Sequence, residues 1–209
     1  LFGLEIELIM PASSSKERTA TMEAFGAKVV LMETMEICRD YAEEKGLESD
    51  YYLMNQFSNP DNYLAHYKTT GPEIWRDTEG LITHFVSAMG TTGSIMGNSM
   101  FLKEQNPDIR IVGCQPTEES SIPGIRRWPA AYMPKIFDAS RVDQVLDISQ
   151  ADATDMARKL ARTEGIFAGM STGGAAHAAL KVAGALESGV IVFIACDRGD
   201  RYLSTDLFG

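Results

Sequence analysis

Several features that would assign a protein to a specialised class are missing from this sequence. Its 209 residues contain three cysteines and three histidines. Cys38, Cys114 and Cys196 are odd in number and widely spaced, which is untypical of a disulfide framework and favours reduced thiols in a cytoplasmic protein. No two histidines stand at metal-ligand spacing, so we predict no metal site.

Long apolar runs and an excess of positive charge are also missing. No apolar stretch approaches the roughly 20 residues needed to cross a bilayer, and no signal peptide is recognisable, so we expect no membrane association. The formal net charge of −10 argues against nucleic-acid binding, which needs clustered positive charge. The 44% of hydrophobic residues can still form a core in one large domain or two small ones.

What the sequence does contain is an alternation of strand-like and helix-like segments with short connections. This alternation predicts an α/β fold with parallel sheets and helices on both faces. Predicted strands cover 1–10, 29–32, 51–54, 84–89, 109–112 and a fully buried 190–195; predicted helices cover 14–25, 36–45, 72–76, 95–104, 153–161 and the Ala-rich segment after 174. Ser14 and Glu17 have the spacing of a capping box. Pro60 marks the expected boundary between domains 1–60 and 61–209.

One short loop predicts a phosphate site. Gly90-Thr-Thr-Gly-Ser94 joins the strand at 84–89 to the helix that follows it. Free backbone N–H groups and the helix dipole attract an anion there, and glycine permits close approach. The alternative is that these residues only turn the chain. Two further loops, 113–127 and 196–201, also follow strands, and ligands of open parallel sheets bind at such strand ends.

Six segments spread over the chain match the motifs of a single enzyme family. They are Asn55-Gln-Phe-Ser-Asn-Pro60, Lys68-Thr-Thr-Gly-Pro-Glu-Ile-Trp75, the loop 90–94, Ser120-Ser-Ile-Pro-Gly-Ile-Arg-Arg-Trp-Pro129, Glu164-Gly-Ile-Phe-Ala-Gly-Met-Ser-Thr-Gly173 and Arg201-Tyr-Leu-Ser-Thr205. In this order they resemble the pyridoxal-phosphate-dependent cysteine synthases, or O-acetylserine sulfhydrylases, which have the type II (tryptophan-synthase-β-like) fold. Residues 122–129 and 196–200 are similar to the B-type members.

The resemblance implies a β-replacement in which a sulfur nucleophile displaces the acetate of O-acetylserine, with pyridoxal 5'-phosphate as cofactor. The residues implied to hold the cofactor phosphate are Gly90, Thr91, Thr92, Gly93 and Ser94. Ser171 is implied to face the pyridine nitrogen, where a neutral hydroxyl makes a weaker electron sink than a carboxylate would and so favours replacement over transamination. Alternatively, Ser171 only caps the following helix.

The resemblance also implies roles in substrate binding and catalysis. Gln56 would hold the substrate carboxylate, with a buried amide between domains as the alternative, and Gly124 would line the mouth of the site. Arg126 and Arg127 would form a positive lip that attracts anions such as thiosulfate, although exposed arginines often serve only solvation. Asp197 is a candidate for handling the proton of the incoming thiol; alternatively it pairs with Arg198 or Arg201.

Two family motifs do not occur in the printed residues: the Ser-x-x-Lys-Asp-Arg motif of the Schiff-base lysine and the Thr-Ser-Gly-Asn-Thr-Gly carboxylate loop. We expect both upstream of Leu1, and no lysine present, Lys68 included, takes that role. The printed chain is therefore expected to be inactive and to hold the cofactor weakly, whereas the parent is expected to be a cytoplasmic homodimer. The alternatives are a cystathionine β-synthase, a serine/threonine dehydratase, or a catalytically inactive binding module.

Overall fold

The computed structural model describes residues 3–209 as two compact units. The smaller comprises the chain up to Asn55 together with 199–209, and the larger comprises Gln56–Arg198. The sequence analysis placed its domain boundary at residue 60, and the two units divide after Asn55. The segment 199–209, however, was predicted in the larger domain and groups with the smaller unit, because Ser15 Oγ donates a hydrogen bond to the Arg201 carbonyl (2.5 Å) and Tyr202 is buried.

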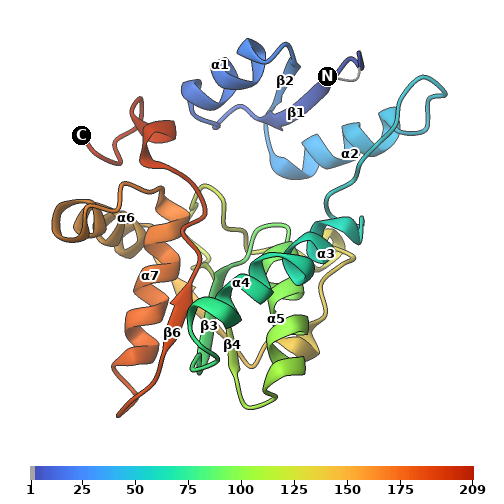
Figure 1. Ribbon diagram of the computed structural model, residues 1–209. Helices are drawn as coiled ribbons and strands as arrows, with labels where there is room; N and C mark the ends of the chain where they lie inside the picture. The colour runs from blue at the N-terminus through green and yellow to red at the C-terminus, as the bar shows by residue number, and fades with distance from the viewer. Residues whose placement is uncertain (1–2) are drawn as a thin grey trace. The chain divides into compact units, whose positions relative to one another are not determined.

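The smaller unit is a two-stranded parallel sheet with two helices (Figure 1). Strands β1 (Glu7–Pro11) and β2 (Lys28–Met32) lie side by side, and helices α1 (Lys16–Ala24) and α2 (Met35–Lys45) pack against them. The predicted strand 1–10 is thus shorter than expected, and its first two residues lie outside the described part of the chain. The predicted strand 51–54 is wrong: the segment is irregular, with Tyr52 85% exposed.

The start of α1 differs from the predicted capping box. The N-cap is Ser15 rather than Ser14, and it makes no side-chain cap hydrogen bond. Glu17, the expected reciprocal partner, instead accepts hydrogen bonds from the backbone N–H and hydroxyl of Ser204 (2.6 and 2.7 Å). Ser15 and Glu17 therefore both bind the segment 199–209. This contact is long-range, so local sequence spacing does not reveal it.

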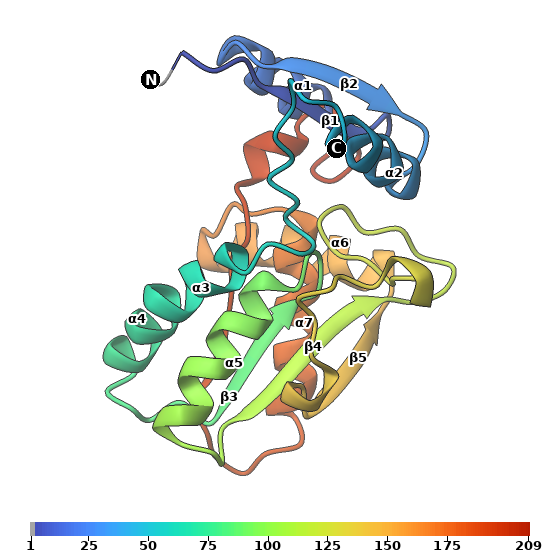
Figure 2. The same ribbon diagram turned by 90° about the vertical axis from the view of Figure 1, so that its right-hand side faces the viewer.

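The larger unit is built on a four-stranded parallel sheet of order β5-β4-β3-β6. Helices α5 and α7 cover opposite faces, with α3 and α4 packed on α5 and α6 packed on α7 (Figure 2). This confirms the predicted α/β class with helices on both faces of a parallel sheet. The bounds are α3 Asp61–Lys68, α4 Thr70–Asp77, β3 His84–Ala88, α5 Gly93–Gln105, β4 Arg110–Pro116, β5 Gln144–Ile148, α6 Gln150–Lys159, a π-helical turn Leu160–Glu164, α7 Met170–Ala183 and β6 Ile191–Phe193, with short 3₁₀ turns at Ala130–Tyr132, Ala139–Arg141 and Gly199–Tyr202.

Burial follows position in the sheet. The central strands β3 and β4 read as apolar runs because both of their faces are covered, and Phe85, Val86 and Ile111 are fully buried. The terminal strand β6 is only half-buried, so the prediction of a fully buried strand at 190–195 is wrong. Strand β5 was not predicted, because as an edge strand it carries exposed Val145 and Asp147. No helix within residues 3–209 is long and apolar enough to span a membrane.

The packing of α3 against α5 yields a stability test at Gly97. A Cβ at this position would overlap the Tyr63 carbonyl and lie 2.9 Å from the Tyr67 nitrogen. We therefore expect Gly97→Ala to lower the free energy of unfolding by about 1–3 kcal/mol in urea denaturation. Gly184→Ala is the matched control, since its Cβ meets nothing closer than 3.5 Å and its backbone is right-handed helical. Equal effects of the two substitutions would contradict this account of the helix pair.

Candidate functional site

The loop 90–94 lies at the carboxyl end of β3, where the chain enters α5. Thr92 is the N-cap of that helix and has a left-handed backbone (φ +72°), which is unusual for a β-branched residue. Thr92 is 2% exposed, and its hydroxyl has no hydrogen-bond partner within the described residues. A buried polar group without a partner costs free energy unless a ligand satisfies it. A helix N-terminus favours an anion as that ligand.

Neighbouring side chains hold this loop in place. The Asn62 amide donates to the Thr91 hydroxyl (3.0 Å) and to the Gln56 carbonyl (2.7 Å). The Ser94 hydroxyl lies 3.1 Å from His66 Nε2. Burial lowers the pKa of His66, which favours the neutral ring, whose Nε2 can accept a hydrogen bond from the Ser94 hydroxyl. The sequence analysis missed Asn62 and His66, since neither belongs to a motif and both reach the loop from α3.

The two glycines of the loop are required by what lies next to them. A Cβ at Gly93 would collide with the Asn62 side-chain oxygen, and one at Gly90 would lie 2.8 Å from the Gly124 carbonyl. The alternative in which they only turn the chain is thus incomplete. They also allow two other segments to approach the loop.

Ser171 lies in the first turn of α7 and is 2% exposed. The N-cap of α7 is Gly169, not Ser171, so the capping alternative does not describe its position. A Cβ at Gly124 would lie 3.2 Å from the Ser171 hydroxyl oxygen. Ser171 is therefore brought together with Gly124, which itself contacts Gly90 of the loop 90–94.

The end of the 190–196 segment is attached to the start of α7. The Cys196 N–H donates to the Thr172 hydroxyl (3.0 Å), and the Asp197 carbonyl accepts from the Gly169 N–H (3.2 Å). Although Cys196 has exposed surface, the protein around its sulfur raises the pKa of the thiol. The structure thus places the backbone of Asp197 beside the start of α7, the helix that carries Ser171.

The predicted substrate residues are distributed unequally. Gln56 is exposed. The Arg126 N–H donates to the Met89 carbonyl (2.8 Å), next to the phosphate loop. Arg127 Nη2 lies 2.6 Å from the Asp147 carboxylate, and its Nε donates to the Pro116 carbonyl (2.8 Å). The guanidinium of Arg127 is thus already engaged within the protein.

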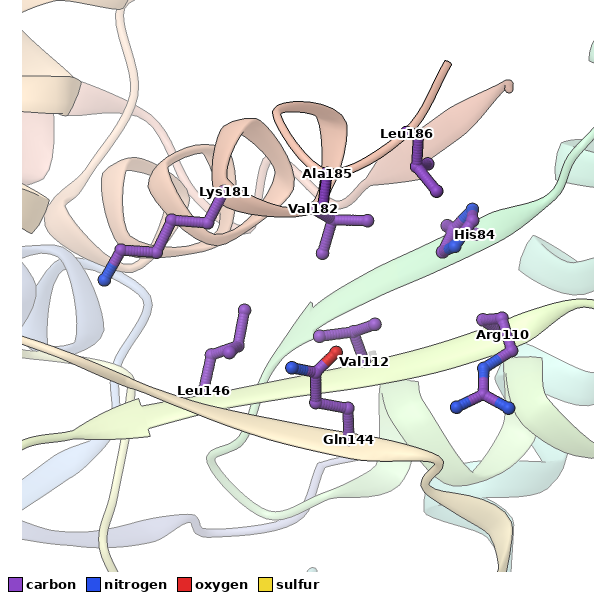
Figure 3. Close-up of a pocket in the computed structure, with 9 residues that line it drawn as sticks. All are labelled: His84, Arg110, Val112, Gln144, Leu146, Lys181, Val182, Ala185 and Leu186. Atoms are coloured by element: carbon purple, nitrogen blue, oxygen red, sulfur yellow. The ribbon is translucent and has the colours of Figure 1, made fainter. Parts of the chain in front are cut away.

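A separate pocket of about 190 Å³ lies at the opposite end of the sheet (Figure 3). It is formed by the first residues of β3, β4 and β5 and by the end of α7, with His84 next to Arg110 at one end and Lys181 reaching away toward the other. Because this pocket is at the amino ends of the strands, it is distinct from the site around loop 90–94. In the part of the chain that the structure describes, no group of three or more His, Cys, Asp or Glu side chains could hold a metal ion.

Comparison with known proteins agrees with this geometry. A family model described as pyridoxal-phosphate dependent enzyme matches residues 1–197, and the chain belongs to this family. Within it, the chain is similar to cysteine synthase B of Salmonella typhimurium (57% identity over 100% of this chain and 70% of that protein) and of Pseudomonas aeruginosa (56% over 99% and 70%). Among solved structures, O-acetyl serine sulfhydrylase isoform 3 from Entamoeba histolytica is 37% identical, with a TM-score of 0.86 over 99% of this chain and 66% of that one. The resemblance and the type II fold predicted from the sequence are confirmed.

The residues present fit pyridoxal phosphate. The unpartnered hydroxyl of buried Thr92 and the N–H groups at the start of α5 provide donors for the phosphate. Buried Ser171 provides a neutral hydroxyl that can donate to a ring nitrogen. These donors come from separate segments, which the Gly90–Gly124 and Gly124–Ser171 contacts connect.

The Thr92 hydroxyl gives a direct test of phosphate binding. We expect Thr92→Ala to weaken binding of pyridoxal 5'-phosphate about tenfold, because one hydrogen bond to a charged group is lost. The free energy of unfolding without cofactor should not fall, since the hydroxyl has no hydrogen-bond partner within residues 3–209. Thr92→Ser, which keeps the hydroxyl, is the control. An absorbance titration measures the affinity, and an unaltered affinity in Thr92→Ala would remove Thr92 from the phosphate site.

The buried and exposed thiols of the larger unit should differ in reactivity. Burial raises the pKa of Cys114 to about 12, so its reactive thiolate is scarce at neutral pH. We expect iodoacetamide at pH 7.5 to modify Cys196 well before Cys114, as followed by peptide mass spectrometry. Urea-unfolded protein is the control, in which both should react at similar rates. Equal rates in the folded protein would show that Cys114 is accessible.

Proposed function

We propose that this protein is a cysteine synthase that replaces the acetate of O-acetylserine with a sulfur nucleophile. The observation that carries this proposal is the pairing of an anion site at Thr92 with a neutral hydroxyl at Ser171, in a chain 57% identical to a cysteine synthase B. A neutral partner at the cofactor ring suits replacement chemistry better than a carboxylate does.

The cofactor residues have distinct tasks. Loop 90–94 binds the phosphate through backbone N–H groups and hydroxyls, and thereby orients the cofactor. The hydroxyl of Ser171 donates to the ring nitrogen without giving the ring a full positive charge. When bound, pyridoxal phosphate supplies the electron sink for loss of the acetate group.

The substrate residues are proposed around this centre. Gln56, which is exposed, binds the substrate carboxylate by its amide, and Gly124 lines the entrance. Asp197 accepts or orients the proton of the incoming thiol, while Arg126 attracts anionic sulfur donors such as thiosulfate. The reactive lysine is proposed to come from sequence beyond the printed residues, in agreement with the 70% of the relatives' length that the chain spans.

The remaining parts of the proposal concern assembly and location. We propose that the protein is a homodimer and that it is cytoplasmic; the small number of cysteines supports only the cytoplasmic location. Sedimentation equilibrium measures the oligomeric state. A catalytically inactive binding module is the alternative from another class, and it is favoured by the absence of the lysine motif from the printed residues.

Substrate pairs separate the candidate activities. The protein extended to the length of its relatives should form cysteine from O-acetylserine and sulfide much faster than cystathionine from serine and homocysteine. The printed chain alone should show background turnover in both assays, because it lacks the lysine motif. A preference of the extended protein for serine with homocysteine would identify a cystathionine β-synthase, and no turnover with either pair would favour the binding module.

A further inference from the structure

The loop 117–129, between β4 and the 3₁₀ turn at Ala130–Tyr132, contacts both halves of the cofactor site. Trp128 Nε1 donates to the Gly90 carbonyl (2.7 Å), and Gly124 lies against both Gly90 and Ser171. Trp128 is 8% exposed and its ring packs edge-on against Phe57 (5.5 Å between centroids). This loop therefore contacts both Gly90 and Ser171, so its position affects the distance between loop 90–94 and Ser171.

One ion pair attaches this loop to the sheet. Arg127 Nη2 lies 2.6 Å from Asp147 Oδ2 on β5, and Arg127 Nε donates to the carbonyl of Pro116, the last residue of β4 (2.8 Å). The other carboxylate oxygen of Asp147 accepts from the Gln115 amide (3.0 Å), and Gln115 is the residue opposite Asp147 in the β4–β5 register. The Asp147 carboxylate on β5 thus binds both Gln115 on β4 and Arg127, the residue that precedes Trp128.

This arrangement gives the adjacent arginines different tasks. Arg127 has its guanidinium directed to Asp147 and Pro116, so it is held within the protein as one member of an ion pair. The Asp147–Arg127 pair is partly exposed, with side chains 53% and 32% accessible, and such pairs contribute little to global stability. Its value therefore lies in the geometry of the loop rather than in the folding free energy.

We propose that Asp147 is a positioning residue which, through Arg127, seats the 117–129 loop against Gly90 and Ser171. It follows that Arg127 is not part of an anion-attracting lip, and that this role is left to Arg126. The inference deepens the proposed function and rests on it only where cofactor and substrates are concerned. The seating of Trp128 can be measured without either.

The first experiment follows Trp128 by acrylamide quenching of fluorescence in a Trp75→Phe background, which leaves one tryptophan. We expect Asp147→Asn and Arg127→Ala each to raise the quenching constant about twofold, because the buried indole becomes more accessible when the loop loosens. Asp143→Asn is the matched control: it also removes a carboxylate that pairs with basic side chains, Lys103 and Arg110, but at the other end of β5. Unchanged quenching in Asp147→Asn, or an equal rise in Asp143→Asn, would overturn the proposal.

Rescue and kinetics complete the test. The charge-exchanged double variant Asp147→Arg/Arg127→Asp should bring the quenching constant back toward the single-tryptophan parent, and failure to do so while the protein remains folded by circular dichroism would contradict pairing as the cause.

In the extended protein, Arg127→Ala and Asp147→Asn should lower kcat/KM for sulfide and thiosulfate by the same factor, whereas Arg126→Ala should lower it selectively for thiosulfate. A selective thiosulfate defect in Arg127→Ala would restore the two-arginine lip and overturn the assignment. Absence of any turnover, with the quenching results as expected, would refute only the proposed function.

Discussion

The candidate site depends on the contact between the turn after β3 and the loop after β4. Gly90 and Gly124 approach so closely that a Cβ at position 90 would lie 2.8 Å from the Gly124 carbonyl oxygen. The Trp128 indole fixes this approach by donating to the Gly90 carbonyl. The same loop places Gly124 beside Ser171 and thereby connects the start of α5 to the start of α7.

The parallel sheet explains why such a contact can exist. Strands β3 and β4 are neighbours with their carboxyl ends at the same edge, so the loops that follow them meet without a long connection. The apolar core under this edge keeps both strand ends fixed. A left-handed threonine with an unsatisfied hydroxyl is tolerated at position 92 because its surroundings hold it in place. Such local cost is typical of ligand sites.

The sequence predicted those features that are encoded locally. The strand–loop–helix unit at 84–105 was recognisable because two glycines and three hydroxylated residues stand between an apolar run and a helix, and the family motifs located Ser171. It did not predict β5, whose edge position gives it exposed residues, or α3, which delivers Asn62 and His66 to the loop. It also predicted a shared role for Arg126 and Arg127, whereas Arg127 is bound to Asp147, 20 residues along the chain, through a contact that no local pattern encodes.

The central claim is that loop 90–94 and Ser171 together bind pyridoxal phosphate. A crystal structure of the protein with pyridoxal 5'-phosphate tests it most directly. The account predicts the phosphate within hydrogen-bonding distance of the Thr92 hydroxyl and the first N–H groups of α5, with the Ser171 hydroxyl facing the ring nitrogen. A phosphate bound elsewhere, or a Thr92 hydroxyl satisfied by a protein group while Ser171 faces away from the ring, would contradict it.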